Sequence, residues 1–412
     1  MWRLKIRSPG AYSINLIYDI FSLPDWATLY LYNEDKSYVI GAFTSDNNQQ
    51  HGQFATQPVP GNAITLEYHE PANVRGLGRI NISKVIHAYR PTFNKRAWQT
   101  GAPDNLLGKV LDFGDSGPCN INVRCPEWAS WDQQIRFVAM IITSSGTRLC
   151  SGALINNSRQ DLTPFFLTAN HCLKGNPDTW IIMFNYESRG CANINGPTNQ
   201  TISGTMTVAN NSASDFALLS LSQRPPGSYR TYYAGWSRPN TPAQSSVGIH
   251  HPRGDIKKIS HDYDPVVSSD YEPDPYLLDS HWKVRDWDQG TTEPSSSGSP
   301  LFDQNRRIVG QLYGGSAACG NDLPDYYGKF SMSWDYGSTY STRLRDWLDP
   351  INSGSSTLDG MEGPPTEPTN VVITNPNQIG MSPRLSWSAS SSPHGIAYYQ
   401  IFRTPSYYNP LN

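Results

Sequence analysis

Residues Phe165–Cys172 read FFLTANHC, an apolar run that ends in a histidine and a cysteine. A short run of aromatic and aliphatic residues is typical of a buried strand, so His171 is expected at a strand end. A second cysteine, Cys150, stands upstream in CSGALI. A bridge between the two would tie the histidine to a neighbouring strand and stabilise the fold by roughly 3 kcal/mol. A lone histidine is more often structural, but this setting favours a catalytic imidazole.

Strand-like runs recur throughout residues 114–350. IRFVAMIIT, TWIIMFNYE, DFALLSLS and RRIVGQLYGG each combine aliphatic and aromatic residues, and turn residues separate them. Strands so close together, with no long helix between them, predict an antiparallel barrel or a pair of barrels. The stretch YGKFSMSW at 327–334 is expected to be a further strand. YSTRLRDWLDP at 340–350 is the one convincing helix, because its apolar residues fall on one face.

The length of the chain predicts more than one domain, since 412 residues exceed an ordinary single domain. Residues 1–105 contain short alternating runs such as AITLEYHE between turn residues, which predicts a small β-sandwich. Residues 114–352 carry the barrel strands, and residues 353–368 have the Ser, Gly and Pro content of a flexible linker. Residues 369–412 resemble the first half of a fibronectin type III module in their LSW and YYQIFR runs. The predicted fold class is therefore all-β.

Composition excludes several classes of partner. The net charge is −3 and the pI is about 6.3, so no strong positive field favours nucleic acid. No run of 18 apolar residues occurs, so no membrane span is expected. The first residues, MWRLKIRSPG, carry charges where the apolar part of a signal peptide would stand.

The six cysteines all lie between residues 119 and 319. An even number confined to one segment predicts three disulfides and an oxidising, extracellular setting. Six buried thiols in a cytosolic protein are the alternative. No metal site is expected, because no Cys-x-x-Cys pair occurs. The sequence by itself leaves fifteen pairings open.

The stretch TTEPSSSGSPLF at 291–302 packs four serines into five positions, which suits either a polar turn or an exposed nucleophile. A nucleophilic serine needs an imidazole to take its proton and a carboxylate to orient that imidazole. Asp215 in SASDFALLSL is the carboxylate candidate, because a carboxylate that opens a buried strand is costly unless it is paired. His171, Asp215 and one of these serines therefore form a candidate catalytic triad.

These motifs, in this order, resemble the bacterial lysyl endopeptidases, which are similar to trypsin. CSGALINN, FLTANHC, SDFALLSL, HHPRGDIKKIS, TEPSSSGSPLFD and RLRDWLDP carry the resemblance over about 114–350. It implies a chymotrypsin-like fold of two six-stranded β-barrels with the triad between them. The family motif Gly-Ser-Ser-Gly-Ser-Pro implies that Ser297 is the nucleophile and that the backbone N–H groups of Ser295 and Ser297 form the oxyanion hole. Ser295 departs from the family, which has glycine there, and serine could strain the loop.

The resemblance also implies the disulfides and the substrate pocket. The disulfide pairs would be Cys119–Cys319, Cys125–Cys191 and Cys150–Cys172. The pocket would have Asp325, in CGNDLPDYYGKF, at its base to receive a lysine ammonium, with Asp322 and Glu293 as competing acids. Tyr313, in QLYGG, stands where the family has a histidine beside the triad, and we expect it to line the substrate site.

Together these features predict a secreted serine endopeptidase that cleaves after lysine through an acyl-enzyme, without a cofactor. We expect a monomer whose partners are protein or peptide substrates, with no nucleic acid and no membrane span.

Residues 1–105 resemble the family's prosegment region, and self-cleavage after Lys109 and a permanently joined chain are both open. HHP at 250–252 is expected to be structural, and RGD at 253–255 a chance match. The rival is a non-catalytic module of the same fold that binds protein or glycan.

Overall fold

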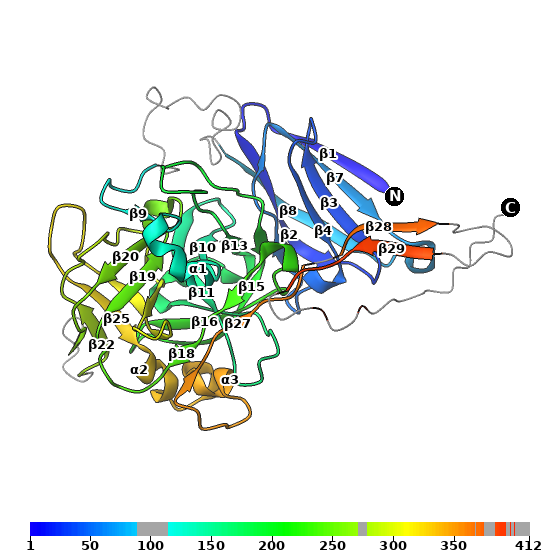
Figure 1. The fold of residues 1–412 in the computed structure, drawn as a ribbon. Helices are drawn as coiled ribbons and strands as arrows, with labels where there is room; N and C mark the ends of the chain where they lie inside the picture. Colours follow the sequence, from blue (N-terminus) through cyan, green and yellow to red (C-terminus); the bar gives the residue numbers. More distant parts are fainter. Residues whose placement is uncertain are drawn as a thin grey trace, which may run out of the picture.

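The computed structural model describes residues 1–88, 114–270, 278–366, 368–374, 384–392, 396 and 399. Strands make up most of its regular structure, and the helices are short (Figure 1). Among the described residues, no helix has both the length and the apolar character needed to cross a membrane. Lys109, the predicted processing position, lies outside the described residues.

The N-terminal unit consists of two four-stranded sheets. The first sheet contains, in order, β1 (Trp2–Arg7), β7 (Ala63–His69), β3 (Thr28–Asn33) and β4 (Val39–Phe43). In the second, β2 (Ser13–Ser22) pairs with β5 (Phe54–Ala55), β6 (Val59–Pro60) and β8 (Arg79–His87). Buried side chains from both sheets, among them Leu16 and Tyr18 of β2 and Leu31 and Leu66 of the first sheet, form one hydrophobic core.

The second unit is built on two larger sheets, of which the first has seven antiparallel strands. In sheet order they are β14 (Thr201–Ser203), β13 (Ile181–Phe184), β10 (Val138–Ile142), β11 (Arg148–Ile155), β12 (Phe165–Ala169), β16 (Phe216–Leu221) and β15 (Thr205–Asn211). Every residue of β10, β12 and β13 is buried, which explains why these strands read as continuous apolar runs.

The second large sheet has ten strands. Its main path is β21 (Val267–Ser269), β22 (His281–Val284), β25 (Asp325–Lys329), β24 (Ile308–Gly315), β23 (Pro300–Phe302), β19 (Ser246–His250), β20 (Lys258–Asp262) and β9 (Ile121–Asn122). Off this path, β18 (Trp236–Ser237) pairs with β24, and β26 (Thr357–Leu358) pairs with β18. Residues of both large sheets, such as Leu154 and Leu167 of the first and Ile249 and Phe302 of the second, share one core.

Two sequence-based expectations for the end of this unit are wrong. The predicted strand at 327–334 ends at Lys329 and continues as the helix α2 (Phe330–Asp335). Phe330 and Trp334, four residues apart, both pack against Trp236, and this spacing suits a helix face. The predicted helix at 340–350 is reduced to the 3-10 turn η8 (Tyr340–Thr342) and the single turn α3 (Arg345–Leu348), because Arg343 between them is extended.

The predicted flexible linker is paired with the second unit along much of its length. We call residues 353–366 the strap, which runs from α3 across the body toward β28 (Thr369–Thr374) (Figure 1). Within it β26 pairs with β18, and β27 (Met361–Glu362) pairs with β17 (Tyr232–Tyr233). Glu362 accepts two hydrogen bonds of 2.8 Å from the Arg136 guanidinium. Composition indicated flexibility, but backbone pairing and this ion pair hold the segment in place.

Beyond the strap, β28 forms an antiparallel pair with β29 (Arg384–Ser388). Most of the remaining residues predicted to resemble a fibronectin type III module lie outside the described residues.

The N-terminal unit contacts loops around the seven-stranded sheet. Asn15 donates to the Ser144 carbonyl at 2.6 Å, Tyr38 donates to the Thr198 carbonyl at 3.2 Å, and Asn47 donates to Gln223 at 2.8 Å.

We predict that the strap contributes to the stability of the second unit through its half-buried ion pair. The Glu362→Ala variant removes the main partner of Arg136, whose side chain is only 11% exposed, and should lower the free energy of unfolding by about 2 kcal/mol. Asp359→Ala is the matched control on the same strap, because Asp359 pairs with Arg307 but is 82% exposed. It should cost about 0.5 kcal/mol or less. Equal effects in urea unfolding would show that the strap is not fixed by Glu362.

Candidate active site

His171 and Asp215 meet because they stand at the ends of neighbouring strands. His171 lies in the turn η4 (Asn170–Cys172) directly after β12, and Asp215 directly precedes β16. The two strands are antiparallel with Ala169 opposite Phe216, so the residues just beyond this pair face each other. The His171 Nδ1 atom lies 2.6 Å from Asp215 Oδ2, and the His171 backbone N–H donates to Oδ1 at 2.8 Å.

The Asp215 carboxylate is buried, with 2% of the residue exposed. Burial raises the pKa of Asp215 above its ordinary value, while the hydrogen bond from His171 opposes that rise. An ionised carboxylate at this position accepts the Nδ1 proton, which leaves Nε2 as the basic nitrogen of a neutral imidazole. The pair can therefore present a general base.

Ser297 is held against the same strand end. Its carbonyl accepts a hydrogen bond from Ser151 N at 2.9 Å. A Cβ added to the next residue, Gly298, would lie 2.1 Å from Thr168 Oγ1 and 2.7 Å from Ala169 N. Glycine is thus required at position 298, both for this close approach and for its φ of +80°. Within the described residues no hydrogen bond joins the Ser297 hydroxyl to His171, a bond that often tightens only when substrate binds.

We call residues 293–297 the nucleophile turn, and its backbone groups are almost fully paired. Each carbonyl oxygen of the turn accepts a hydrogen bond, and the donors are, in order, Ser296 N, Arg253 N, Ser151 Oγ, Ser299 N and Ser151 N. The amides of Glu293 and Ser296 in the turn, and of Gly298 after it, also have acceptors. In the described part of the chain, the amides of Ser295 and Ser297 have none. Two free N–H groups beside one serine are what an oxyanion requires.

Ser295 holds a backbone conformation that favours glycine. Its φ is +74°, in the left-handed region. Its hydroxyl donates to the Arg148 carbonyl at 3.3 Å, and its own carbonyl is held by Ser151 Oγ at 3.0 Å. Serine in place of the family's glycine therefore strains the backbone at position 295. The Ser295 N–H nevertheless has no acceptor among the described residues.

Asp325 lies at the start of β25, opposite Gly315 of β24. Its Oδ2 accepts hydrogen bonds from Thr292 Oγ1 at 2.7 Å and from Trp287 Nε1 at 2.8 Å. Oδ1 is buried and has no partner of good geometry among the described residues, although the Ala317 backbone also favours the charged form. Burial raises the pKa of this carboxyl group. A Cβ on Gly315 would lie 2.4 Å from Oδ1, so the close approach of Asp325 to β24 requires glycine at position 315.

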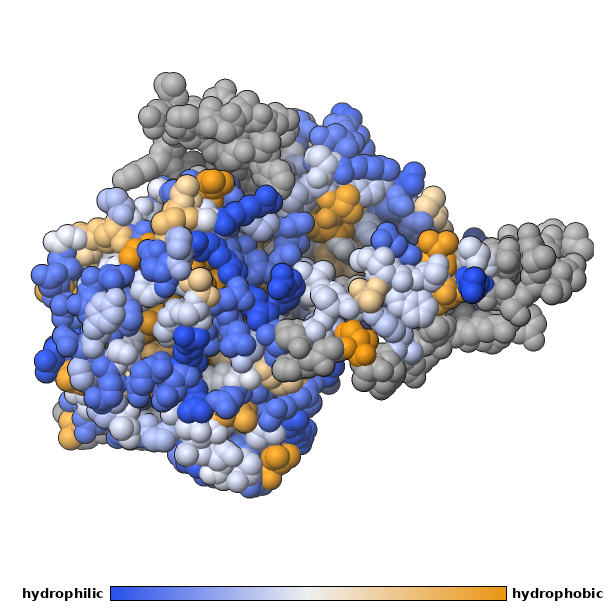
Figure 2. Space-filling model, in the orientation of Figure 1, coloured by the Kyte–Doolittle hydropathy of each residue, from blue (hydrophilic) through white to orange (hydrophobic). Residues whose placement is uncertain are grey.

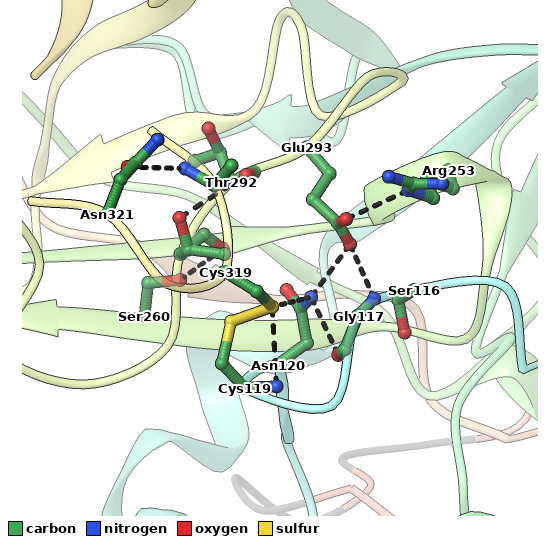
Figure 3. The surroundings of a disulfide bond; sticks show 12 residues. Ser116, Gly117, Cys119, Asn120, Arg253, Ser260, Thr292, Glu293, Cys319 and Asn321 are labelled. Carbon is green, nitrogen blue, oxygen red and sulfur yellow. Dashed lines mark hydrogen bonds and ion pairs between the residues drawn. A yellow bond between two sulfur atoms is a disulfide. The ribbon is translucent and has the colours of Figure 1, made fainter. Parts of the chain in front are cut away.

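The two competing acids are arranged differently. Asp322 is exposed on a loop. Glu293 is buried, but its carboxylate accepts hydrogen bonds from Gly117 N and Asn120 Nδ2, each at 2.8 Å, and pairs with Arg253 at 2.8 Å (Figure 3). Of the three acids, Asp325 alone is buried and has no cationic partner among the residues that the structure describes.

Tyr313 of β24 lies beside the histidine. Its ring centre is 5.5 Å from that of His171 and also 5.5 Å from that of His281. Burial lowers the pKa of His281 to about 4, so this second imidazole is neutral at ordinary pH. The sequence drew attention to Tyr313, but it indicated no role for Thr292 in the 291–302 stretch, and His281 and Trp287 stand in no motif.

Three disulfides join the six cysteines: Cys119–Cys319, Cys125–Cys191 and Cys150–Cys172. These are the pairs that the resemblance implied. Cys150–Cys172 ties β11 to the turn that carries His171, and Cys119–Cys319 lies beside the Glu293 contacts (Figure 3).

The HHPRGD stretch is buried except for Arg253. His250 and His251 are both buried, with their ring nitrogens near Ser296, Ser260 and the Asp255 carbonyl. Asp255 is fully buried and accepts hydrogen bonds from Gly114 N and Ser116, so of the RGD tripeptide only Arg253 is exposed.

Comparisons with known proteins agree with this set of motifs. The family model for the lysyl endopeptidase C-terminal domain matches residues 113–328, more than half of the chain. A lysyl endopeptidase of Pseudomonas aeruginosa is 30% identical over an alignment of 308 residues, and the match covers 68% of this chain and 62% of that protein. The chain thus spans less than two thirds of that relative's length.

Solved structures of proteases are also similar, at low identity. The Rv3671c protease from M. tuberculosis in its active form has 17% identity and a TM-score of 0.33, covering 55% of this chain and 89% of that one. The MamO protease domain from Magnetospirillum magneticum has 11% identity and a TM-score of 0.36, covering 51% of this chain and 100% of that one. On the family match, the chain belongs to the lysyl endopeptidase family.

Proposed function

We propose that the protein is a secreted serine endopeptidase that cleaves peptide bonds after lysine. The observation that carries this proposal is the pairing of His171 with Asp215 beside a turn whose free amides are those of Ser295 and Ser297. This combination supplies a base, a nucleophile and an oxyanion site within one small region.

In the proposed mechanism Ser297 Oγ attacks the substrate carbonyl while His171 Nε2 takes the hydroxyl proton. The negative charge that forms on the carbonyl oxygen is bound by the amides of Ser295 and Ser297. His171 then gives its proton to the leaving amine, which leaves an acyl group on Ser297. Water, activated by the same imidazole, releases the acyl group and restores the hydroxyl. Asp215 stays ionised and stabilises the imidazolium in both steps.

Lysine selectivity is proposed to come from Asp325. The nucleophile turn and the Asp325 pocket share β24, since Leu312 bonds to Gly298 and Ser299 while Gly315 faces Asp325. A buried carboxylate with an unpaired oxygen is a favourable partner for a buried ammonium, which is otherwise very costly to desolvate. The preference for lysine over arginine rests on family membership.

The architecture around this site is part of the proposal. We infer that the two large sheets correspond to the two six-stranded barrels of a chymotrypsin-like domain. Residues 1–105 would then be a prosegment-like domain, and residues 369–412 a partial fibronectin type III-like module. Three disulfides suit an extracellular monomer that acts on protein or peptide substrates.

The second candidate is a protease-like module that binds protein or glycan without catalysis. The strained Ser295 favours it, because a distorted oxyanion turn would slow acyl transfer. The free amide of Ser295 argues against it, since the donor is still available.

The specificity prediction compares matched peptide substrates that differ only in lysine, arginine or leucine before the scissile bond. The wild type should cleave the lysine peptide at least roughly 100-fold faster, by kcat/KM, than the leucine peptide. Asp325→Asn keeps the shape but removes the charge, and should lose most of that difference. Ser297→Ala is the control for contaminating proteases and should fall by roughly 10³-fold or more. Cleavage after leucine at the lysine rate, or an unchanged preference in Asp325→Asn, would remove Asp325 from the pocket.

A second prediction isolates the strain at Ser295. Ser295→Gly and Ser295→Ala both delete the hydroxyl, so their difference reports only on the backbone. Glycine should be more stable than alanine by about 1 kcal/mol in urea unfolding, because φ is positive at this position. The glycine variant should also match or exceed the wild type in kcat. Equal stabilities for the two variants would show that the turn is not strained at Ser295.

A further inference from the structure

His250, the last residue of β19, connects the nucleophile turn to the neighbouring strand β20. Its Nδ1 lies 2.8 Å from Ser296 Oγ, and its Nε2 lies 3.1 Å from Ser260 Oγ. Ser260 Oγ in turn donates to the Thr291 carbonyl at 2.8 Å. His250, Ser260 and Ser296 are all fully buried. Through Ser260, the His250 imidazole thus links Ser296, which precedes Ser297, to Thr291, two residues before the nucleophile turn.

The protons of this chain can be assigned without conflict. Because Ser260 donates its hydroxyl proton to Thr291 O, its oxygen accepts from the Nε2–H of His250. The Nδ1 lone pair then accepts from the Ser296 hydroxyl. The Ser296 oxygen accepts from the Glu293 backbone N–H at 3.2 Å. Each group is both satisfied and oriented, with the imidazole neutral.

The environment keeps the imidazole in this neutral form. Burial, together with the nearby Lys258 ammonium, lowers the pKa of His250 to about 3. A neutral imidazole with one donor and one acceptor nitrogen is what the hydrogen-bond chain requires, and a protonated one would lose its acceptor.

Glu293, the first residue of the nucleophile turn, is held by contacts that do not involve His250. The Glu293 carboxylate holds Gly117 N, Asn120 Nδ2 and Arg253 Nε, next to the Cys119–Cys319 disulfide (Figure 3). These contacts hold Glu293 in place. The Glu293 backbone N–H is therefore a fixed donor to the Ser296 hydroxyl oxygen. The hydroxyl of Ser296 is therefore held from two sides, by Glu293 and by His250.

We propose that His250 is a positioning residue for the oxyanion turn, acting through the Ser296 hydroxyl. Ser296 lies between the two residues whose free amides would bind the oxyanion, and its carbonyl shares a peptide plane with the Ser297 amide. Holding its side chain therefore restrains the Ser297 amide directly and limits the movement of the backbone at Ser295. The arrangement uses only neutral hydrogen bonds. This inference rests on the proposed function and adds a residue outside the triad to it.

A purely structural histidine would affect stability alone, so the test separates catalysis from binding and folding. His250→Ala, His250→Asn, Ser296→Ala and the wild type are assayed for kcat and KM on a lysyl peptide. Each is also titrated with a peptidyl lysinal, an aldehyde whose Ser297 adduct needs the oxyanion amides, and with n-butylamine, which fills only the lysine pocket. Ser246→Ala is the matched control, because Ser246 is a buried serine on the same strand with no hydroxyl partner among the described residues.

We expect kcat to fall by roughly 10- to 100-fold in His250→Ala and Ser296→Ala, with KM within about threefold of the wild type. Lysinal affinity should fall in proportion, while n-butylamine affinity stays unchanged. His250→Asn should recover part of the loss, because its amide can occupy the place of Nδ1 and bond to Ser296. Ser246→Ala should behave as the wild type.

Unchanged kcat and lysinal affinity in folded Ser296→Ala would overturn the positioning role, and this variant decides the matter if His250→Ala does not fold. A wild type that neither cleaves the peptide nor binds the lysinal would instead contradict the proposed endopeptidase function itself.

Discussion

The buried carboxylate of Asp215 is the constraint on which the candidate site depends. Removing a carboxylate from water is costly unless hydrogen bonds replace the lost hydration. Here the replacements are the imidazole and backbone N–H of His171, both supplied by the turn at the end of β12. Because β12 and β16 are adjacent and antiparallel, the pairing of these two strands also brings together the hydrogen bonds that stabilise the buried charge.

The second large sheet positions the remaining residues of the candidate site. Its strands β23, β24 and β25 carry the nucleophile turn and Asp325, while β19 contributes His250 from beneath the turn. The contact across the sheets is made by Gly298, which fits against Thr168 and Ala169 only because it has no side chain. The candidate site therefore requires both sheets in their correct relation. The shared core and the strap, which pairs with β17 and β18, maintain that relation.

Short sequence motifs predicted those residues of the site whose role depends on their immediate neighbours in the chain. FFLTANHC placed His171 at a strand end, and the position of Asp215 before an apolar run indicated a paired carboxylate. Family resemblance was needed to choose Ser297 among four serines and Asp325 among three acids. Predictions of secondary structure from residue type were wrong in two segments, where burial and the spacing of apolar residues favoured another structure. Phe330 and Trp334 were assigned to a strand although their spacing suits a helix, and the strap was assigned to a linker although it pairs with the second unit.

The remaining contacts could not be predicted, because they join residues far apart in sequence. Ser151 binds the nucleophile turn across more than 140 residues, and Glu293 binds Gly117 and Asn120 across more than 170 residues. His250 was interpreted as structural, and its burial agrees with that, but its bond to Ser296 links it to the proposed chemistry. The backbone conformation of Ser295 likewise depends on the closed turn rather than on its own residue type.

The most direct measurement is active-site labelling with a pair of peptidyl diphenyl phosphonates that differ only in a lysine or leucine side chain, followed by mass-spectrometric mapping of the adduct. The account predicts that the lysine reagent modifies Ser297 of the folded protein much faster than the leucine reagent, and that Ser297→Ala and urea-unfolded protein are not modified. No adduct on the folded wild type, an adduct on Ser295, Ser296 or Ser299, or equal modification by both reagents would contradict it.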